Sequence, residues 1–230
     1  DFRLFSFFKS FIKTFITKKE AILSEARLTG TELTNAAYRA VKTAIDMVAD
    51  AEFLDYDIVT IPNLKNTDLV RDLVNVCRER GDAIAIVDLL GDYKFPGDTA
   101  NGQAVAADKT IAIGTVIGLN LDNSYGAAYF PAVYAPNERT YLPASIAALG
   151  AYAGTERRAA LWFAPAGFNR GGLSEATSGV SVSKTSIMLN SAARDDLYAA
   201  NINPIATFPG EGVVIFGQKT LQTTPSALDR

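Results

Sequence analysis

The chain has 230 residues, of which 48% are hydrophobic and 20% charged, a composition typical of a globular protein with a substantial core. Its formal net charge of −3 gives no general attraction to nucleic acid, whose binding depends on lysine and arginine neutralising phosphates. The sequence contains no histidine, which excludes the Ser-His-Asp and Cys-His catalytic arrangements and removes the commonest metal ligand.

Cys77 is the only cysteine, so the chain can form no internal disulfide and no four-thiolate zinc site. It falls on the apolar side of a predicted helix, which favours a small buried side chain over a reactive thiol. The chain starts at Asp1 without a methionine and stops at Arg230. These ends suggest a piece of a longer protein.

The first 28 residues have the pattern of an amphipathic helix, with large apolar side chains mostly three or four positions apart. The residues on this face are Phe2, Phe5, Phe8, Ile12, Phe15 and Ile16. Lysines interrupt the apolar run, so it is too short for a membrane span. The helix could bind a membrane surface or a partner, or pack on its own protein. The last interpretation is favoured because Glu20 and Glu25 soon end the basic character.

A second helix is predicted from about residue 29 to residue 50. Thr29 and Glu32 have the spacing of a capping box, in which a hydroxyl and a carboxylate bind free backbone N–H groups at a helix start. The apolar residues that would share its buried face are Leu33, Ala37, Val41, Ala44, Ile45 and Val48.

The next part of the chain predicts a strand–helix–strand unit. Residues 57–61 have the pattern of a short strand, and residues 83–87 form a nearly continuous apolar strand of the kind buried on both faces. Between them, Asn66 or Thr67 caps a helix that ends at Gly81. This order of elements favours a parallel sheet.

Alternating elements without an internal repeat are predicted for the rest of the chain. Residues 92–101 predict a loop, and residues 102–119, ambiguous between helix and strand, are assigned mainly to helix. A strand is expected at 127–133, where Pro131 indicates an edge position or a bulge. The further elements expected are a helix at 143–157, a turn at 170–172, a segment without clear periodicity at 180–188, a short helix at 192–201 and a strand at 212–216.

Together these patterns predict an α/β fold with a mixed, largely parallel central sheet flanked by helices. Residues 29–230 would form this body, and residues 1–28 would precede it as a helical arm. No low-complexity linker divides the body.

The segment from Gly212 to Thr220 differs from a phosphate-binding P-loop by one inserted residue, Gln218. A P-loop bends so that its backbone N–H groups converge on phosphate, with the lysine directly after the second glycine. Here Lys219 comes one position later, and residues 213–216 have the side chains of a buried strand. A strand is therefore favoured over a nucleotide site.

Residues 167–172, GFNRGG, could form an anion-binding nest that uses Arg170, because consecutive free N–H groups can hold an oxyanion. No catalytic base is adjacent in the sequence, so a tight turn between elements is the favoured interpretation.

Two carboxylate pairs could in principle serve acid–base chemistry. Asp195 and Asp196 are adjacent on a predicted helix and therefore point in different directions, which favours an exposed position that interacts with the helix dipole. Asp55 and Asp57 form the second pair.

Asp88 and Asp92 are the best candidates for a Mg²⁺ site. They follow the predicted strand 83–87, at the carboxyl end where α/β sheets place ligands. Loop solvation and helix capping are nevertheless favoured over metal binding. We therefore expect no catalytic, cofactor-binding or metal-ligating residue in the chain.

Residues 123–136, NSYGAAYFPAVYAP, and 162–171, WFAPAGFNRG, carry the most specific signal in the sequence. They resemble the central region of contractile-tail sheath proteins. The alanine-rich helix predicted at 143–157 and the segments 194–204 and 212–230 stand in that family's order. The resemblance covers approximately residues 31 to 230.

The resemblance implies a structural subunit of a bacteriophage tail sheath, with no enzymatic activity and no cofactor. Its partners would be other sheath subunits and the inner tail tube, with no nucleic acid or membrane, and contraction would drive the tube through the host envelope. The subunit would belong to the tail of the virion and would be assembled in the host cytoplasm. Sheaths of phage-like bacteriocins and secretion systems share the motifs, and a small α/β nucleotide-binding module or enzyme is the alternative.

The ends of the chain depart from the family pattern. In the family, the stretch matching residues 225–230 continues into a C-terminal domain that contacts the tube and carries an arm, and an N-terminal arm lies far upstream. Both arms join neighbouring subunits by strand addition. Neither arm is in this sequence, so we expect a soluble and mainly monomeric fragment. Residues 1–28 match no family motif and are interpreted as an arm or the end of an inserted domain.

Three aromatic residues of the second motif, Trp162, Phe163 and Phe168, are expected in the core. Each is large and apolar, and Pro165 and Gly167 between them would fix the direction of the chain.

Overall fold

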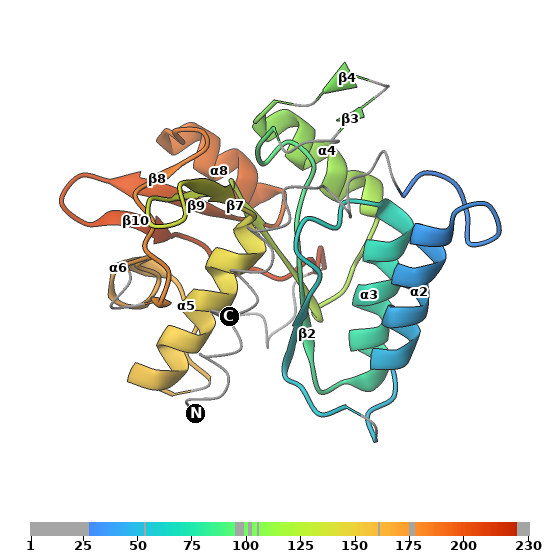
Figure 1. Ribbon diagram of the computed structural model, residues 1–230. Coiled ribbons are helices and arrows are strands. Elements are labelled where there is room, and N and C mark those ends of the chain that lie inside the picture. The colour runs from blue at the N-terminus through green and yellow to red at the C-terminus, as the bar shows by residue number, and fades with distance from the viewer. Residues whose placement is uncertain are drawn as a thin grey trace.

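The computed structural model describes residues 28–52, 54–94, 99–100, 103–104, 106–160, 162–174 and 178–224 (Figure 1). The helical arm predicted for residues 1–28 lies outside this part, apart from the buried Leu28. Within the described part, no helix is both long enough and apolar enough to cross a bilayer.

A five-stranded sheet forms the centre of the fold, in the order β1-β2-β5-β9-β10. Its strands are β1 (Ile58–Thr60), β2 (Ile84–Val87), β5 (Gly126–Phe130), β9 (Ile202–Phe208) and β10 (Gly212–Ile215). The first four pair in parallel and β10 pairs antiparallel with β9. The predicted mixed, largely parallel sheet is therefore confirmed.

Helices cover both faces of this sheet (Figure 1). One face carries α2 (Ala36–Val48), α3 (Thr67–Arg80), α4 (Lys109–Leu119) and α8 (Ser191–Ala199). The other face carries α5 (Ala144–Arg158). Because strand side chains alternate, Ala85 and Val87 pack in the first core, whereas Ile86 packs under α5 in the second.

The strand–helix–strand prediction is confirmed in detail at α3. Asn66 caps its start by accepting a hydrogen bond from Leu69 N, and Gly81 ends it in the left-handed conformation with a φ of 73°. Glycine is favoured at position 81 because a residue with a side chain disfavours positive φ.

The start of α2 differs from the capping-box prediction. Asn35 is the N-cap and accepts hydrogen bonds from Ala37 N and Tyr38 N, so the helix begins later than Thr29. Leu33 consequently precedes the helix and is 95% exposed. The amide oxygen of Asn35 competes successfully with the predicted pair because it reaches two N–H groups at once.

Residues 92–119 also differ from the prediction. A short hairpin of β3 (Thr99–Ala100) and β4 (Gln103–Ala104) occupies part of the segment assigned to loop and helix. The helix α4 begins only at Lys109, where the Asp108 side chain accepts a hydrogen bond from Thr110 N.

The strand expected at 127–133 divides into two. β5 ends at Phe130, and the chain continues through the cis Phe130–Pro131 bond into β6 (Val133–Ala135). β6 lies between β7 (Thr140–Leu142) and β8 (Lys184–Thr185) in a separate antiparallel sheet. The sequence predicts an edge position or a bulge at Pro131, but this proline lies between β5 and β6, outside both strands, and β5 is a central strand.

β9 is a strand that the sequence analysis did not assign. Its third residue is Pro204, which pairs in register with Phe130 of β5 and whose carbonyl accepts from Phe216 N. A proline normally argues against a central strand because it lacks the N–H group. The helix expected at 192–201 and the strand expected at 212–216 are both confirmed, as α8 and β10.

The predicted burial of the motif aromatics is wrong. Trp162 is 83% exposed, and Phe163 and Phe168 are about half exposed. The chain leaves α5 and runs over the surface before the short helix α6 (Gly167–Arg170), so these rings contact other surface side chains. Their size predicted burial, but their position after the end of α5 determines their exposure.

Candidate functional site

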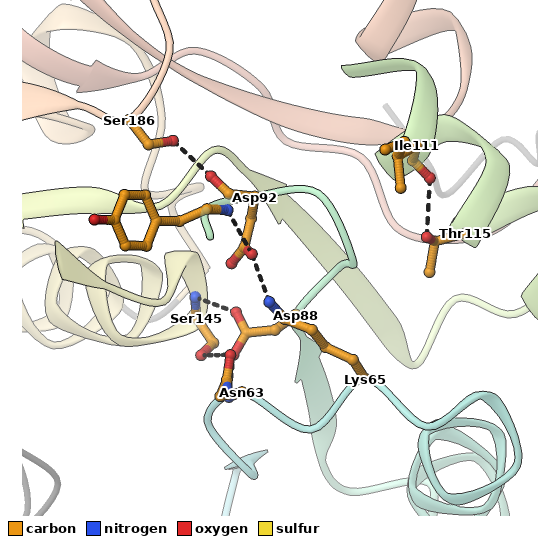
Figure 2. A network of polar contacts seen from close by, with 9 residues as sticks. Asn63, Lys65, Asp88, Asp92, Ile111, Thr115, Ser145 and Ser186 are labelled. Atoms are coloured by element: carbon orange, nitrogen blue, oxygen red, sulfur yellow. Dashed lines mark hydrogen bonds and ion pairs between the residues drawn. The ribbon is translucent and has the colours of Figure 1, made fainter. Parts of the chain in front are cut away.

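Asp88 and Asp92 lie where the sequence placed them, just after the carboxyl end of β2. Both side chains are buried, so the expected loop solvation is wrong. They belong to a network that joins the start of α3, the end of β2 and the start of α5 (Figure 2).

The Asp88 carboxylate links segments on both faces of the sheet. Its Oδ2 accepts from Asn63 N at 2.7 Å and from Ser145 Oγ at 2.7 Å, while its Oδ1 accepts from Ser145 N at 2.9 Å. Ser145 is in the first turn of α5, so Asp88 satisfies a backbone N–H group that the helix cannot. The predicted capping interaction is confirmed, and it comes from a distant strand.

Asp92 forms an ion pair with Lys65. The Lys65 Nζ lies 2.6 Å from Asp92 Oδ1, and neither side chain is exposed to solvent. The same Oδ1 accepts from Tyr93 N, and the backbone carbonyl of Asp92 accepts from Ser186 Oγ. The Lys65 ammonium thus lies where a cation would have to bind between these carboxylates (Figure 2).

The donor set therefore fits a structural network better than a Mg²⁺ site, which needs several oxygen ligands. Among the described residues no group of three or more acidic or cysteine side chains could hold a metal. Burial raises the pKa of the Asp88 carboxyl, although hydrogen bonds from Asn63 and Ser145 act in the opposite direction.

The segment 212–220, whose sequence differs from a P-loop by one inserted residue, forms β10 and the loop after it. Its interior is buried strand, as predicted. The Lys219 backbone N–H group, which a P-loop would direct at phosphate, donates to Asn203 Oδ1 at 2.7 Å, and the Lys219 ammonium donates to the Tyr198 carbonyl at 2.8 Å. A Cβ on Gly217 would lie 2.8 Å from Asn203 Oδ1, so this glycine permits close packing.

The glycine-rich segment 167–172 forms the single helical turn α6. The Gly171 N–H group donates to the Gly167 carbonyl, and Arg170 Nε donates to the Ala164 carbonyl. The Arg170 guanidinium also lies 4.6 Å from the centre of the Phe163 ring. These groups hold the turn together, which agrees with the favoured reading as a connection between elements.

The two remaining carboxylate pairs lie apart from the network. Asp196 is 2.6 Å from the Lys109 ammonium on α4, so this pair links two helices. Asp195 is exposed, as expected. Asp55 and Asp57 are exposed in the loop before β1.

A surface pocket of about 220 Å³ lies between β2, β5 and the segment after α5. Its lining includes Ile84, Tyr129, Trp162 and Lys219 but no carboxylate. The Tyr129 hydroxyl, which lines the pocket, donates to the Tyr152 hydroxyl at 3.1 Å. Burial raises the pKa of both phenols, which disfavours a phenolate base here.

Four polar residues of these networks were not singled out from the sequence. They are Asn63, Lys65, Ser145 and Asn203. The available signals were weak: a lysine after a strand and a serine early in a helix are usually exposed. Asn203 carried a better signal, because asparagine is depleted in strands and requires hydrogen-bond partners when buried.

The fold and these networks define an α/β protein whose buried polar groups connect its secondary-structure elements. Residues 31–221 match the family model of the phage tail sheath protein central domain, and the chain belongs to this family.

Relatives and solved structures agree with this assignment. The chain is 32% identical over 155 residues to a tail sheath protein of Vibrio phage KVP40 and 30% identical over 147 residues to one of Enterobacteria phage T4. These alignments cover 67% and 59% of the chain but 21% of each relative, so the chain spans about a fifth of their length.

The fold is similar to that of two contracted sheaths. The helical sheath of the anti-feeding prophage matches with a TM-score of 0.54 at 21% identity, over 86% of this chain and 46% of that one. The sheath complex of the extracellular contractile injection system PVC matches with a TM-score of 0.58 at 17% identity, over 80% and 45%.

Proposed function

We propose that this chain is the central part of a sheath subunit in the contractile tail of a bacteriophage. Copies of the subunit would assemble around the inner tail tube, and contraction would drive the tube through the host envelope. The observation that carries the proposal is the family match over residues 31–221. The similarity in fold to contracted sheaths of two injection systems supports it.

A phage tail is favoured over an injection system because the relatives at 30% identity or more are phage tail sheath proteins. The subunit would then be part of the virion and would be assembled in the host cytoplasm.

The proposed role needs no catalytic residue. The candidate carboxylates bind groups of the fold itself: Asp88 binds Ser145, and Asp92 pairs with Lys65. The Lys219 N–H group donates to Asn203 Oδ1. The resemblance to sheath proteins implies that contraction would take its energy from the assembled lattice and not from nucleotide hydrolysis.

Electron microscopy of the full-length polypeptide that contains these residues tests the proposal. We expect hollow tubes in two forms, one long and narrow and one short and wide. Particles of a single, invariant form would contradict contraction, and the absence of any tube would contradict the sheath function.

A nucleotide-binding module is the alternative, and thermal unfolding distinguishes it. A ligand at a hundredfold excess over its Kd stabilises a protein by about 2.7 kcal/mol. We expect saturating ATP with Mg²⁺ to leave the melting temperature unchanged. An increase that the Lys219→Met variant abolishes would establish a nucleotide site and overturn the proposal.

A further inference from the structure

Two surfaces of opposite charge lie at opposite edges of the central sheet. β1 and β10 are the two edge strands, and the loop before β1 therefore lies far from the segments that flank β10. Figure 1 shows α6 and β10 on one side of the molecule and α2, which leads into the loop, on the other.

The aromatic edge lies beside β10 and consists of Phe168, Phe208, Phe216, Arg158, Arg170 and Arg194. Its three phenylalanine rings contact one another with centroids 5.0 to 5.6 Å apart, yet Phe168 and Phe216 are 50% and 41% exposed. Contiguous exposed aromatics of this kind are typical of protein interfaces.

The arginines of the aromatic edge are held in place by uncharged carbonyl groups, which leave their positive charge unpaired. Arg158, Arg170 and Arg194 each donate to a backbone carbonyl, of Gly154, Ala164 and Leu189 respectively. No carboxylate of the described residues lies within 4.0 Å of these guanidinium groups. The surface therefore presents both apolar rings and uncompensated positive charge.

The acidic loop, residues 50–52 and 54–57, has the complementary character. Its carboxylates, Asp50, Glu52, Asp55 and Asp57, are all exposed. None forms an ion pair with a described cation. Leu54 between them is 39% exposed, so an apolar group accompanies the negative charge.

The acidic loop is held in one shape. Arg80 donates to the Val48 and Leu54 carbonyls at 3.0 Å each, while its charge is paired with Asp82. The Tyr56 hydroxyl also donates to the Val48 carbonyl. A preformed loop loses little conformational entropy when it binds.

We propose that the aromatic edge of one copy binds the acidic loop of the next copy. The two surfaces differ and lie on opposite edges, so the contact is heterologous and adds copies in one direction, giving a ring or a helix. Complementary charge would fix the orientation, and the rings would supply the apolar contact. The inference rests on the proposed function and assigns the surfaces through which sheath copies meet.

Charge reversal tests the contact on the chain itself at high protein concentration, where a chain that is mainly monomeric when dilute still associates measurably. We expect Asp55→Lys/Asp57→Lys and Arg158→Glu/Arg170→Glu each to weaken self-association, measured by sedimentation, by about tenfold or more. The matched control Glu32→Lys/Glu138→Lys changes two exposed carboxylates elsewhere and should leave self-association within about twofold of the unmodified chain. An equal mixture of the two reversed proteins should associate again, because each reversed surface then meets its complement.

Cross-linking decides the matter where association is weak or a reversed variant is misfolded. Ala51→Cys and Asn169→Cys place one exposed thiol on each surface, and the native Cys77 is buried. With a short bis-maleimide, the mixture of the two variants should give covalent dimers while each variant alone gives none. A mixture of Ile117→Cys and Met188→Cys, both exposed elsewhere, is the control.

If the mixture gives no more dimers than this control, the inference is overturned, even if the full-length protein forms contractile tubes. Specific cross-linking together with an absence of tubes would instead contradict the proposed function and leave this contact established. Dimers from either single variant would show an isologous contact and also overturn it.

Discussion

Lys65 Nζ lies 2.6 Å from Asp92 Oδ1, and both side chains are completely buried. Moving two charges out of water is costly, so the pair is sustained by its geometry and by further hydrogen bonds such as the one from Tyr93 N. The pair connects the segment before α3 to the segment after β2, so it joins two connecting segments at the carboxyl end of the first strand–helix–strand unit.

Removal of one partner of this pair should be strongly destabilising. We expect Lys65→Met to lower the free energy of unfolding by about 3–5 kcal/mol, because it leaves Asp92 as an uncompensated buried charge. The double variant Lys65→Met/Asp92→Leu should lose less than the sum of the single losses. Urea denaturation of the four proteins measures this coupling.

The exposed pair of Lys42 and Asp46, 2.7 Å apart, provides the control. Lys42→Met should cost less than about 1 kcal/mol, since water screens this interaction. Equal losses at Lys65 and Lys42 would show that the buried pair is not a determinant of stability.

Asp88 should give stability a specific pH dependence. Burial raises its pKa in the folded protein above its usual value, so the folded state binds more protons than the unfolded state between the two pKa values. Stability contributed by this group should therefore be greatest in acid and fall as pH rises from about 4 through the raised pKa. Unfolding free energies of the unmodified protein and Asp88→Asn across this range test the sign. A difference that stays constant with pH, or one that grows in favour of the unmodified protein, would contradict it.

Trp162 should tolerate truncation despite its size. The side chain is 83% exposed, so we expect Trp162→Ala to change the free energy of unfolding by less than about 1 kcal/mol. Phe130 is fully buried on β5, and Phe130→Ala should cost about 3–5 kcal/mol. Thermal or urea unfolding of both variants checks the contrast, and a large loss at Trp162 would place this ring in a packed environment.

Asp122 should hold the end of the described chain in place. Its carboxylate accepts from Thr223 N at 2.8 Å, Thr224 N at 3.2 Å and Thr224 Oγ1 at 2.8 Å, and these bonds lower its pKa. The tether is present above the usual aspartate pKa and is lost as pH falls through the lowered one.

Amide hydrogen exchange measures this tether directly. Asp122→Ala should increase exchange at Thr223 and Thr224, while Leu221 N, which donates to the Gly126 carbonyl, should be less affected. Unchanged exchange at the two threonines would show that Asp122 does not hold them.

Local patterns predicted the elements that depend on neighbouring residues. The helix from Asn66 to Gly81 was predictable because its cap, its apolar face and its C-terminal glycine all agree. The strand at β2 and the parallel pairing followed from a continuous apolar run and the order of elements. A prediction failed where two local signals competed, at Thr29 and Asn35, and β9, which contains Pro204, was not assigned.

Sequence alone determined the absence of histidine chemistry, the composition of a packed α/β body and the resemblance to sheath proteins, because these depend only on residue types and their order. Tertiary structure alone decided that Lys65 meets Asp92 across 27 positions and that Asp88 caps a helix 57 positions away. It also decided that Trp162 faces solvent. Long-range pairing and burial depend on how the strands and helices pack, and no periodicity within a single segment encodes which distant polar groups will be enclosed together.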